Sequence, residues 1–381
     1  MRVQVPHERA PRERRVAATP ETVGKLLKKQ HEVVVEKDAG LAAGFPDAAY
    51  TEAGATVVEE LAAHWGQADA VIGVRAPEPS QAAELKEGAL LVGFLEPDRN
   101  LEMVKALRDA KVTSIAMELI PRITRAQSMD ALSSQASLAG YKAALLAAAH
   151  LDKYFPLLMT AAGTIQPARA VIMGAGVAGL QAIATCRRLG ATVEVSDIRE
   201  AVREEVESLG GRFIDLPMEE KGEAEGGYAK QMSEDFLRKQ REIVAERLTH
   251  ADLAITTALI PGRPAPKLIS EEMVKGMRPG AVIVDMAIAR GGNCALAKPD
   301  EIVTAHGVTI LAPSNVPATV PADASRLYAR NVETLLRHLT DEGNSKLAAL
   351  LDEEDEIAVG SLLTHGGEVR HGRTRDALAE A

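Results

Sequence analysis

A glycine-rich turn holds the clearest set of residues with chemical potential in this chain. An apolar segment, residues 171–173, runs into the letters GAGVAG, with glycines at Gly174, Gly176 and Gly179, and a helix-like segment follows at residues 180–189. In this spacing the first glycine permits a tight turn, the second lets a pyrophosphate approach the backbone, and the third lets helix and strand pack closely. The free N–H groups at the start of the helix would hold the pyrophosphate. The turn therefore predicts a dinucleotide site.

An acidic residue follows this turn at the distance that such a site needs. Residues 192–196 predict a second strand, and Asp197 ends it about twenty residues after Gly174. A carboxylate there can hydrogen-bond the ribose of the adenosine half, and its charge disfavours a 2′-phosphate. The order of strand, turn, helix, strand and acid predicts an NAD site. The alternative is a βαβ turn that holds no nucleotide.

A second group of polar side chains lies at the entry to an apolar helix, at a predicted domain junction where clefts form. Arg122 offers a planar fork of donors, and Gln127 offers both a donor and an acceptor. Asp130 can accept a hydrogen bond, and Ser133 can take either role. This mix suits a nicotinamide carboxamide. The chemistry alone favours equally an N-cap by Asp130 or Ser133, with Arg125 exposed.

Other candidate sites are weaker. Residues 256–262 (TTALIPG) follow a strand and would reach over a cofactor at the carboxyl edge of the sheet. Asp285 ends another strand and is either a site residue or a helix-capping acid. The histidines show no HxH or HExxH spacing and neither cysteine has a CxxC partner, so no metal site is expected. The sequence also has no Gly-x-Ser-x-Gly nucleophile elbow.

The elements that must carry these residues alternate between strands and helices. The expected strands lie at residues 3–5, 32–36, 56–58, 71–74, 90–95 and 113–116 in the first third, and at 170–173, 192–196, 211–214, 253–256, 281–285 and 309–311 further along the chain. Alternation of this kind predicts parallel sheets covered by helices. The expected fold class is therefore α/β, with two Rossmann-like domains that contain parallel sheets and are joined by two long helices.

Two long helices set the expected domain boundaries. Residues 135–151 and 321–339 each predict one continuous helix, through which the chain would cross between domains. The N-terminal α/β domain would then be discontinuous, comprising residues 1–134 and 325–381. Residues 135–324 would form the Rossmann domain that binds the nucleotide.

Bulk properties exclude several classes of protein. A net charge of −10 over 381 residues argues against non-specific nucleic-acid binding. The two cysteines, Cys186 and Cys294, are far apart, which fits a reducing cytoplasm. The longest uncharged run, residues 170–186, is the glycine-rich turn, and the chain begins as a strand, so we expect no direct membrane insertion and no signal peptide. Residues 219–234 are charged and glycine-rich, which is typical of a lid or a disordered loop.

Six segments resemble the NAD(H)-binding domain of proton-translocating NAD(P) transhydrogenase. They are RRVAATP at residues 14–20, RITRAQSMDALSSQ at 122–135, GAGVAGLQAIAT at 174–185, GGYAK at 226–230, TTALIPG at 256–262 and VDMAIARGGN at 284–293. The resemblance covers nearly the whole chain. Alanine dehydrogenase is similar in fold and ancestry, and is the related class from which this chain must be told apart.

Three positions separate the two activities. Alanine dehydrogenase reduces an imine, so it needs acid–base groups and a cation that anchors a carboxylate. Where that class has a lysine, a histidine and an aspartate, this chain has Arg75, Glu96 and Ala289. Direct hydride transfer needs no general acid or base, only two nicotinamide rings held face to face in a dry site. The resemblance therefore implies a transhydrogenase subunit. An alanine dehydrogenase-like NAD-dependent oxidoreductase and an NAD sensor without catalysis are the alternatives.

The resemblance also implies which residues act on the cofactor, NAD(H). Gln127 would contact the nicotinamide and position its ring, while Arg122, Asp130 and Ser133 would fix the carboxamide and neighbouring groups. The implied cofactor-binding set is Arg122, Gln127, Ser128, Met129, Asp130, Gly174, Gly176, Val177, Gly179, Asp197, Ile198, Arg199, Gly227, Tyr228, Ala258 and Leu259.

Five members of this set have more specific implied roles. Val177 would lie over the pyrophosphate, and Leu259 would border the cofactor. Arg199, beside the adenosine ribose, could host a 2′-phosphate, which leaves the selectivity for NAD over NADP open. Gly227 and Tyr228 would belong to a mobile loop that closes on the bound nucleotide.

The implied activity requires partners. Hydride would be exchanged between NAD(H) on this chain and NADP(H) on a partner subunit, coupled to proton translocation through membrane-spanning partner subunits. The chain is expected to form a homodimer and to be cytoplasmic, held at the cytoplasmic side of the inner membrane by those partners. Neither a nucleic acid nor a metal is expected among its ligands.

Overall fold

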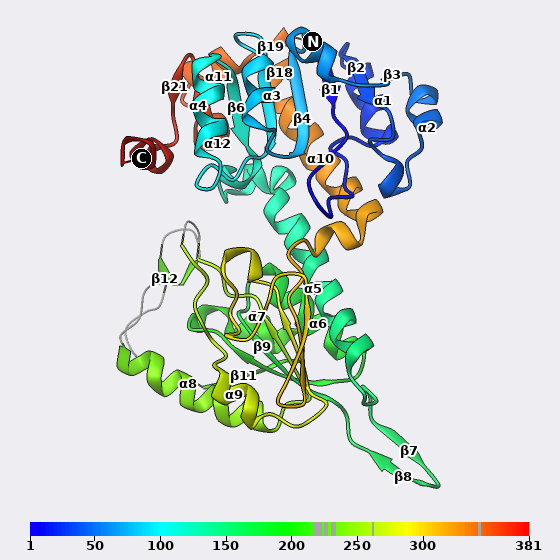
Figure 1. Ribbon diagram of the computed structural model, residues 1–381, viewed down its shortest axis with the longest axis vertical. Helices are drawn as coiled ribbons and strands as arrows, with labels where there is room; N and C mark the ends of the chain where they lie inside the picture. Colours follow the sequence, from blue (N-terminus) through cyan, green and yellow to red (C-terminus); the bar gives the residue numbers. More distant parts are fainter. Residues whose placement is uncertain (216–222, 225–227, 230–233, 261–262, 342–343, 381) are drawn as a thin grey trace. The chain divides into compact units, whose positions relative to one another are not determined.

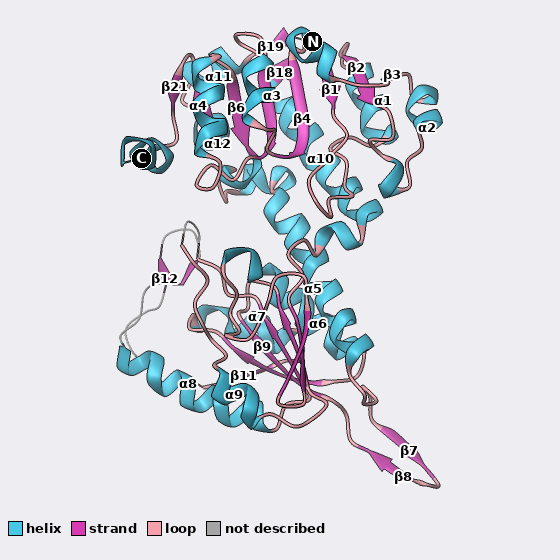
Figure 2. Cartoon of the chain, in the orientation of Figure 1, coloured by secondary structure: helices cyan, strands magenta, loops and turns pink. Residues whose placement is uncertain are grey.

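Alternating apolar segments form strands and helices in both halves of the chain. The computed structural model describes residues 1–381 except 216–222, 225–227, 230–233, 261–262, 342–343 and 381. The chain divides into unit 1, Met1–Gln135 with Ala318–Ala381, and unit 2, Ala136–Pro317 (Figure 1). Each unit has helices around a mainly parallel sheet, so the expected α/β fold class is confirmed (Figure 2).

Unit 1 is built on an eight-stranded sheet in the order β21-β20-β6-β5-β4-β1-β2-β3. Its strands are β1 (Arg2–Val5), β2 (Glu32–Glu36), β3 (Thr56–Val58), β4 (Ala70–Arg75), β5 (Leu90–Phe94), β6 (Thr113–Ala116), β20 (Leu362–His365) and β21 (Glu368–Val369). The six strands β1 to β6 pair in parallel with their neighbours. Strands β20 and β21 add an antiparallel edge next to β6. The sequence predicts the parallel strands but not this hairpin, whose few apolar residues make no clear pattern.

Helices, most of them short, cover the sheet of unit 1. They are α1 (Pro20–Lys28), α2 (Asp47–Glu52), α3 (Pro79–Glu84), α4 (Leu101–Asp109), α10 (Pro321–Leu339), α11 (Leu347–Asp352), α12 (Glu356–Ser361) and α13 (Gly372–Glu380), with 3-10 turns η1 (Leu41–Ala43), η2 (Ala62–Gln67), η3 (Met117–Leu119) and η4 (Thr124–Met129) and the small pair β18 (Thr340–Asp341) and β19 (Asn344–Ser345). Helix α1 begins at Pro20, because Thr19 accepts a hydrogen bond from the Thr22 N–H and Pro20 takes the first helical position.

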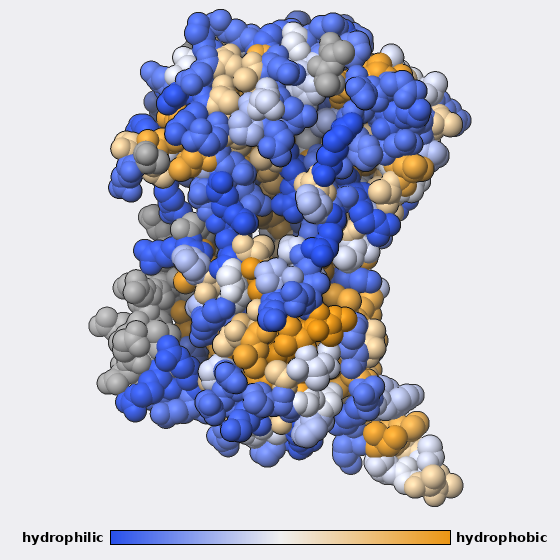
Figure 3. All heavy atoms as spheres, in the orientation of Figure 1, coloured by the Kyte–Doolittle hydropathy of each residue, from blue (hydrophilic) through white to orange (hydrophobic). Residues whose placement is uncertain are grey.

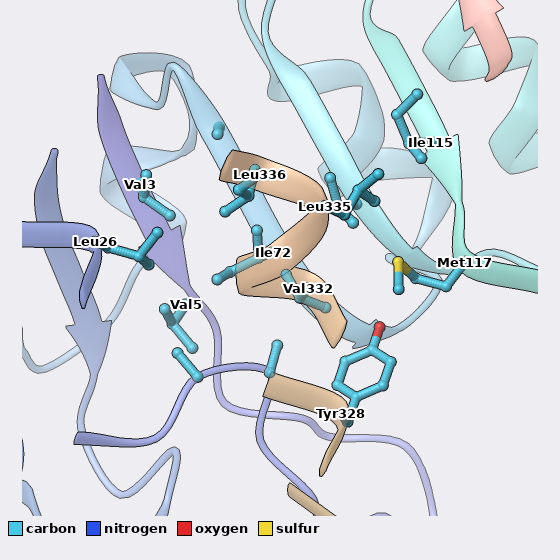
Figure 4. Close-up of a cluster of buried hydrophobic side chains, with 14 of the residues drawn as sticks. Val3, Val5, Leu26, Ile72, Ile115, Met117, Tyr328, Val332, Leu335 and Leu336 are labelled. Carbon is cyan, nitrogen blue, oxygen red and sulfur yellow. The ribbon is translucent and has the colours of Figure 1, made fainter. Parts of the chain in front are cut away.

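Helix α10 supplies the centre of the core of unit 1. Its buried Val332, Leu335 and Leu336 belong to one apolar cluster with Val3 of β1 and Ile72 of β4. Figure 4 shows these side chains between the helix and the strands. Because α10 packs into this core, the C-terminal segment completes the unit that the N-terminal segment begins.

Unit 2 contains a seven-stranded sheet in the order β11-β10-β9-β14-β15-β17-β16. Its strands are β9 (Arg169–Met173), β10 (Thr192–Ser196), β11 (Arg212–Phe213), β14 (Leu253–Thr256), β15 (Val282–Asp285), β16 (Ile302–Ala305) and β17 (Val308–Leu311). All pairings are parallel except that of β16 with β17. The sequence predicts every strand but β16, a four-residue edge strand whose side chains are half-buried or exposed.

The remaining elements of unit 2 are helical or short. They are α6 (Val177–Arg188), α7 (Arg203–Ser208), α8 (Glu234–Thr249) and α9 (Glu271–Gly276), the turns η5 (Glu200–Val202) and η6 (Ile288–Arg290), and the strand pairs β7 (Leu158–Thr160) with β8 (Gly163–Ile165) and β12 (Glu223–Ala224) with β13 (Tyr228–Ala229). Among the helices of the described residues, none combines the length and the apolar character that a membrane span requires.

The chain passes between the units twice. The first passage lies within α5 (Ala131–His150), which begins before the predicted start at residue 135. The second lies at Pro317, in the turn η7 (Pro317–Thr319) that precedes α10. Helix α10 therefore does not carry the crossing expected of it, because its apolar face is packed within unit 1.

The two sheets share one topology. Their parallel strands follow the orders β3-β2-β1-β4-β5-β6 and β11-β10-β9-β14-β15-β17, so each sheet reverses its strand order beside its first strand. The crevice outside the carboxyl ends of the strands at such a reversal is where open α/β sheets bind ligands. In unit 2 this point lies between β9 and β14, and in unit 1 it lies between β1 and β4.

Candidate nucleotide-binding site

The glycine-rich turn of unit 2 follows β9 at this reversal point. Gly174 has φ +102°, a left-handed conformation that favours glycine, and a Cβ on it would lie 2.6 Å from Thr257 Oγ1. A Cβ on Gly179 would lie 1.9 Å from the carbonyl oxygen of Gly174. A Cβ on Gly176 would meet no atom of the described residues within 4 Å. The first and third glycines are therefore required by packing, whereas the second borders open space that a ligand can enter.

The start of α6 completes this turn. Gly176 is the N-cap and has no side chain to cap the helix, and Val177 at the first helical position is 39% exposed. The first N–H groups of a helix have no partner within it, and they carry its positive dipole end. The turn can therefore hold an anionic group such as a pyrophosphate.

Asp197 ties the second strand to the same turn. Its Oδ2 accepts a hydrogen bond from the Ala175 N–H at 2.7 Å. The Arg199 guanidinium donates from Nε to Oδ1 at 3.0 Å and from Nη2 to Oδ2 at 2.8 Å, while Ile198 between them is half-buried. Asp197 thus lies where the sequence places a ribose-binding acid. In this structure the Arg199 guanidinium pairs with the Asp197 carboxylate and neutralises its charge. Arg199 is the residue that leaves the selectivity for NAD over NADP open.

The loop after β14 borders the turn from the other side. Thr257 Oγ1 donates to the Gly174 carbonyl at 3.0 Å, and Ala258 is held by the side chain of Asn293. Leu259 follows and is 47% exposed. These three residues bring the predicted segment 256–262 to the carboxyl edge of the sheet, beside the turn; its residues 261–262 lie outside the described residues.

Asp285 is a structural acid of the loop that follows β15. It is fully buried, and its Oδ1 and Oδ2 accept hydrogen bonds from the N–H groups of Ala287 at 2.9 Å and Cys294 at 2.8 Å. Asp285 therefore holds main-chain groups of its own loop, and it is not a helix cap, because no side chain caps the turn η6 that follows.

The polar residues predicted for the nicotinamide end gather in unit 1. A cavity of about 360 Å³ is lined by Pro121, Arg122, Ile123, Thr124, Gln127, Asp130 and Ser133. Asp130 also caps α5, because its Oδ1 accepts from the Ser133 N–H at 2.9 Å and its Oδ2 from Ser133 Oγ at 2.6 Å. The cap and the cavity are therefore compatible, since Asp130 contributes to both.

The turn η4, which carries Gln127, is anchored by α10. Asn331 Nδ2 donates to the Ser128 carbonyl at 2.8 Å, and its Oδ1 accepts from Ser134 Oγ at 2.8 Å. The side chain of Met129 is 6% exposed and belongs to the core of unit 1, so it anchors the turn rather than facing outward. Gln127 itself is exposed. The sequence gives no sign of Asn331, because its partners lie some two hundred residues away.

The predicted lid lies largely beyond what the structure describes. Gly227 is outside the described residues. Tyr228 lies in β13, whose backbone pairs with β12 in antiparallel fashion. In the part of the chain that the structure describes, no group of three or more His, Cys, Asp or Glu residues is arranged to hold a metal ion.

Two family profiles match the chain. The profile described as "Alanine dehydrogenase/PNT, N-terminal domain" matches residues 4–139, and the one described as "Alanine dehydrogenase/PNT, C-terminal domain" matches residues 143–372. The chain belongs to the alanine dehydrogenase/PNT family. The resemblance carried by the six segments is thereby confirmed.

Relatives within this family bear both names. In Rhodospirillum rubrum, the chain named as the first portion of NAD(P) transhydrogenase subunit alpha is 49% identical over 378 residues, covering 97% of this chain and 98% of that protein. Alanine dehydrogenase of Staphylococcus saprophyticus is 32% identical over 389 residues, covering 99% and 97%. A solved transhydrogenase structure from Sinorhizobium meliloti is 42% identical with a TM-score of 0.83, covering 98% of this chain and 100% of that one.

Two of the three positions expected to separate the two activities, Arg75 and Glu96, belong to an ion-pair network in unit 1. Arg75, at the end of β4, donates from Nε to Glu13 Oε2 at 3.0 Å and from Nη1 to Glu96 Oε1 at 3.1 Å. The side chain of Glu13 is fully buried, and it also accepts from Arg15 Nε and Nη2, each at 2.7 Å. Both guanidinium groups are thus engaged by carboxylates of the chain itself. Ala289, in η6 of unit 2, presents only an exposed methyl group.

Two further carboxylates cap strand ends in this family member. Glu8 accepts from the N–H groups of Val74 at 2.5 Å and Arg75 at 3.3 Å, at the end of β4. Glu118 likewise accepts from the N–H groups of Leu95 and Glu96, just after β5. Each carboxylate satisfies two adjacent N–H groups at the point where the strand ends.

Burial sets the protonation of these groups. It raises the pKa of Glu8 to about 7 and that of Glu118 to about 7, against the hydrogen bonds that lower both values. Burial acts the same way on Glu13, but hydrogen bonds and charge from Arg15 outweigh it and lower the pKa of Glu13 to about 2. Glu13 is therefore a fixed anion, whereas Glu8 and Glu118 hold a proton up to neutral pH.

Proposed function

We propose that this chain is the NAD(H)-binding subunit of a proton-translocating NAD(P) transhydrogenase. The observation that carries the proposal is the pairing of Arg75 with Glu13 and Glu96, in a family that also contains imine-reducing enzymes. Imine reduction needs a cation that receives the substrate carboxylate and groups that move protons. Here the cation is already paired, and the exposed methyl of Ala289 can carry no proton. The likeness to a transhydrogenase alpha subunit across the whole chain supports the same assignment.

The nucleotide of this chain is NAD(H). The turn at Gly174 and the start of α6 suit the pyrophosphate, and Asp197 at the end of β10 suits the adenosine ribose. When bound, NADH donates a hydride from its ring to NADP⁺ on the partner subunit, giving NAD⁺ and NADPH with no proton released. The residues of this chain then need only bind, orient and keep water away.

Gln127, Arg122, Asp130 and Ser133 would act on the ring end. Gln127 carries an amide on an anchored turn, so it can hold the nicotinamide carboxamide in one orientation. Arg122 would add a charged donor, and the Asp130–Ser133 pair would offer fixed polar groups in the same cavity. A ring held this way is poised for transfer, because rate depends steeply on the geometry of the reacting atoms.

The chain would work within a larger assembly. The NADP(H) would be bound by a partner subunit, and the proton path would lie in membrane-spanning partner subunits that hold this chain at the cytoplasmic face of the inner membrane. The likeness to the Rhodospirillum rubrum relative supports that division of labour, because the name of that relative denotes one portion of a subunit.

Self-association would use the hairpin β7–β8. Met159 and Ile165 of the hairpin and Leu157 just before it are 73%, 43% and 53% exposed, and Figure 3 shows apolar residues gathered on it. An isolated two-stranded hairpin is marginally stable in water, so it needs a surface to pack against. A second copy of the chain would supply that surface. Sedimentation of the purified chain checks this point, and a monomer at micromolar concentration would remove the homodimer from the proposal.

One pair of assays separates the proposed function from its alternatives. The chain is mixed with an NADP(H)-binding transhydrogenase subunit, NADPH and the acetylpyridine analogue of NAD, and reduction of the analogue is followed. Reduction that needs both proteins supports the proposal. In parallel, the chain alone is given NADH, pyruvate and ammonia. Turnover there would establish an alanine dehydrogenase, and inactivity in both assays with intact NADH binding would establish a sensor.

A further inference from the structure

The segment VDMAIARGGN, residues 284–293, is one of the six segments that carry the resemblance, and two of its polar residues have no role in the function proposed above. Its Asp285 and Asn293 are both fully buried in unit 2. Both carboxylate oxygens of Asp285 are occupied by the N–H groups of its own loop. Asn293 instead reaches a different loop, the one that borders the glycine-rich turn.

The amide of Asn293 makes three hydrogen bonds to main-chain groups. Its Oδ1 accepts from the Ala258 N–H at 3.1 Å, and its Nδ2 donates to the Ala258 carbonyl at 2.9 Å and to the Pro266 carbonyl at 2.8 Å. The two bonds to Ala258 reproduce the exchange that a neighbouring strand would make. They hold this residue just beyond the end of β14, where strand pairing with β15 has stopped.

Ala258 lies beside the turn that would receive the pyrophosphate. A Cβ added to Gly174 would lie 3.4 Å from the Ala258 nitrogen, so the two backbones leave no spare room between them. The preceding residue, Thr257, donates from its N–H to the Met173 carbonyl at 2.9 Å and from Oγ1 to the Gly174 carbonyl at 3.0 Å. A shift of Ala258 would therefore be transmitted to the backbone of Gly174.

Asn293 is itself held on its far side. Asp285 Oδ2 accepts from the N–H of the next residue, Cys294, at 2.8 Å. The Asn293 carbonyl accepts from the N–H groups of Leu268 at 2.8 Å and Ile269 at 3.0 Å. A continuous set of hydrogen bonds thus runs from β15 through Asn293 and Ala258 to the glycine-rich turn.

We propose that Asn293 is a positioning residue of the nucleotide site, which fixes the loop at Ala258 so that the turn at Gly174 keeps the shape that receives the pyrophosphate. The proposal rests on the proposed function only in taking NAD(H) as the ligand. It assigns Asn293 no contact with the nucleotide. Its effect should fall on ligands that carry a pyrophosphate and spare those that do not.

The test compares three ligands on wild-type chain and on Asn293→Ala. Loss of the amide leaves main-chain groups of Ala258 unpaired, so the Kd values for NADH and ADP should rise about tenfold. The Kd for adenosine, which has no phosphate, should change less than about twofold. Asn100→Ala is the matched control, because Asn100 Nδ2 makes a comparable bond to the Leu95 carbonyl at 2.8 Å in unit 1. That variant should leave all three Kd values unchanged.

A second variant keeps the proposal testable if Asn293→Ala does not fold. Asn293→Asp keeps an acceptor for the Ala258 N–H but faces two carbonyls with a carboxylate. Its NADH affinity relative to wild type should be low at pH ~8 and recover towards pH ~5, where a protonated acid can again donate to a carbonyl. A structural role alone would change the melting temperature without this pH dependence.

The outcomes separate this proposal from the proposed function. If wild-type chain does not bind NADH, the proposed function fails. If wild type binds NADH and Asn293→Ala binds NADH and ADP as wild type does, the positioning role is wrong. Equal loss of adenosine and NADH affinity, or an affinity of Asn293→Asp that does not change with pH, would also overturn it.

Discussion

The two sheets of this chain have the same strand order. They differ in the residues that lie at the point where that order reverses. In unit 2, β9 is followed by Gly174, and a Cβ added to Gly176 would meet no atom of the described residues within 4 Å. In unit 1, β1 leads into a loop whose Glu8 caps the end of β4 and whose Glu13 pairs with Arg15. One reversal point is thus lined by glycines and main-chain N–H groups, and the other is filled by the side chains of the chain itself.

This difference shows that topology creates a crevice but does not decide what occupies it. The same arrangement of strands can present donors to a ligand or satisfy them internally. In unit 1 the two N–H groups after Gly73 are used by Glu8, whereas in unit 2 the helix start at Val177 has no capping side chain. This contrast supports the proposal that the pyrophosphate binds in unit 2, and four substitutions test it.

Gly179→Ala, on the open side, should do the most damage. A Cβ there would lie 1.9 Å from the Gly174 carbonyl oxygen, so strand and helix must separate. We expect a loss of about 3 kcal/mol in the free energy of unfolding and loss of NADH binding, measured by thermal unfolding and by NADH fluorescence titration. Gly176→Ala is the control, since its Cβ would meet no atom within 4 Å and should leave stability unchanged. Normal NADH affinity in Gly179→Ala would show that the turn is not the pyrophosphate site.

Gln127→Asn tests whether the cavity of unit 1 governs the rate of hydride transfer while the turn of unit 2 governs the affinity for NADH. Shortening the side chain should misplace the nicotinamide ring, so hydride transfer should slow by about 100-fold, while the Kd for NADH rises by less than about threefold. Single-turnover transfer to an NADP(H)-binding partner gives the rate, and NADH titration gives the affinity. Equal losses in rate and affinity would assign Gln127 to binding alone.

Glu8→Gln tests the side chains at the reversal point of unit 1 through the pH dependence of stability. The pKa of Glu8 in the folded chain, about 7, lies above its ordinary value of 4.5. The folded chain therefore holds this proton more tightly than the unfolded chain, and the linked stability is complete below about pH 4.5 and is lost as the pH rises through 7. Because Gln cannot ionise, the variant should gain about 2 kcal/mol relative to wild type between pH ~5 and pH ~8.

Denaturant unfolding at the two pH values measures that gain. Glu36→Gln is the control, since the pKa of Glu36, which pairs with Arg9, is lowered rather than raised. Its stability relative to wild type should not rise between the two pH values. If the difference in the free energy of unfolding between Glu8→Gln and wild type is the same at both pH values, Glu8 is ionised at both. The carboxyl group of Glu8 would then hold no proton at the end of β4.

Arg199→Ala should have the mildest consequence of the four. Arg199 neutralises Asp197 in this structure, so its removal should leave a bare carboxylate beside the adenosine ribose. The ratio of NADPH to NADH dissociation constants should rise by about fivefold, because a 2′-phosphate would face that charge alone. Parallel titrations with NADH and NADPH give the ratio. A fall in the ratio would mean that Arg199 serves only to weaken the ribose contact.

Local patterns were enough to predict much of this protein. The strands with continuous apolar runs, the cap at Thr19 and the positions of Gly174 and Asp197 all follow from neighbouring residues. The edge strands β16, β20 and β21 were missed, because they have little apolar pattern of their own and form only against a finished sheet. The sequence also does not predict the roles of Asn293 and Asn331, whose side-chain amides hold loops in place. A single asparagine belongs to no sequence pattern that would indicate such a role.

The amino-acid sequence by itself determines the turn at Gly174, because the turn needs a positive φ and no Cβ, and the spacing of the glycines meets both requirements. The sequence by itself does not determine the hydrogen-bond and ion-pair partners of the polar side chains. The neutralisation of Asp197 by Arg199, the pairing of Arg75 with Glu13 and the clamping of Ala258 by Asn293 are properties of the folded chain. Buried hydrogen bonds and ion pairs depend on atoms within about 3 Å. Such proximity between distant residues exists only once the sheets have formed.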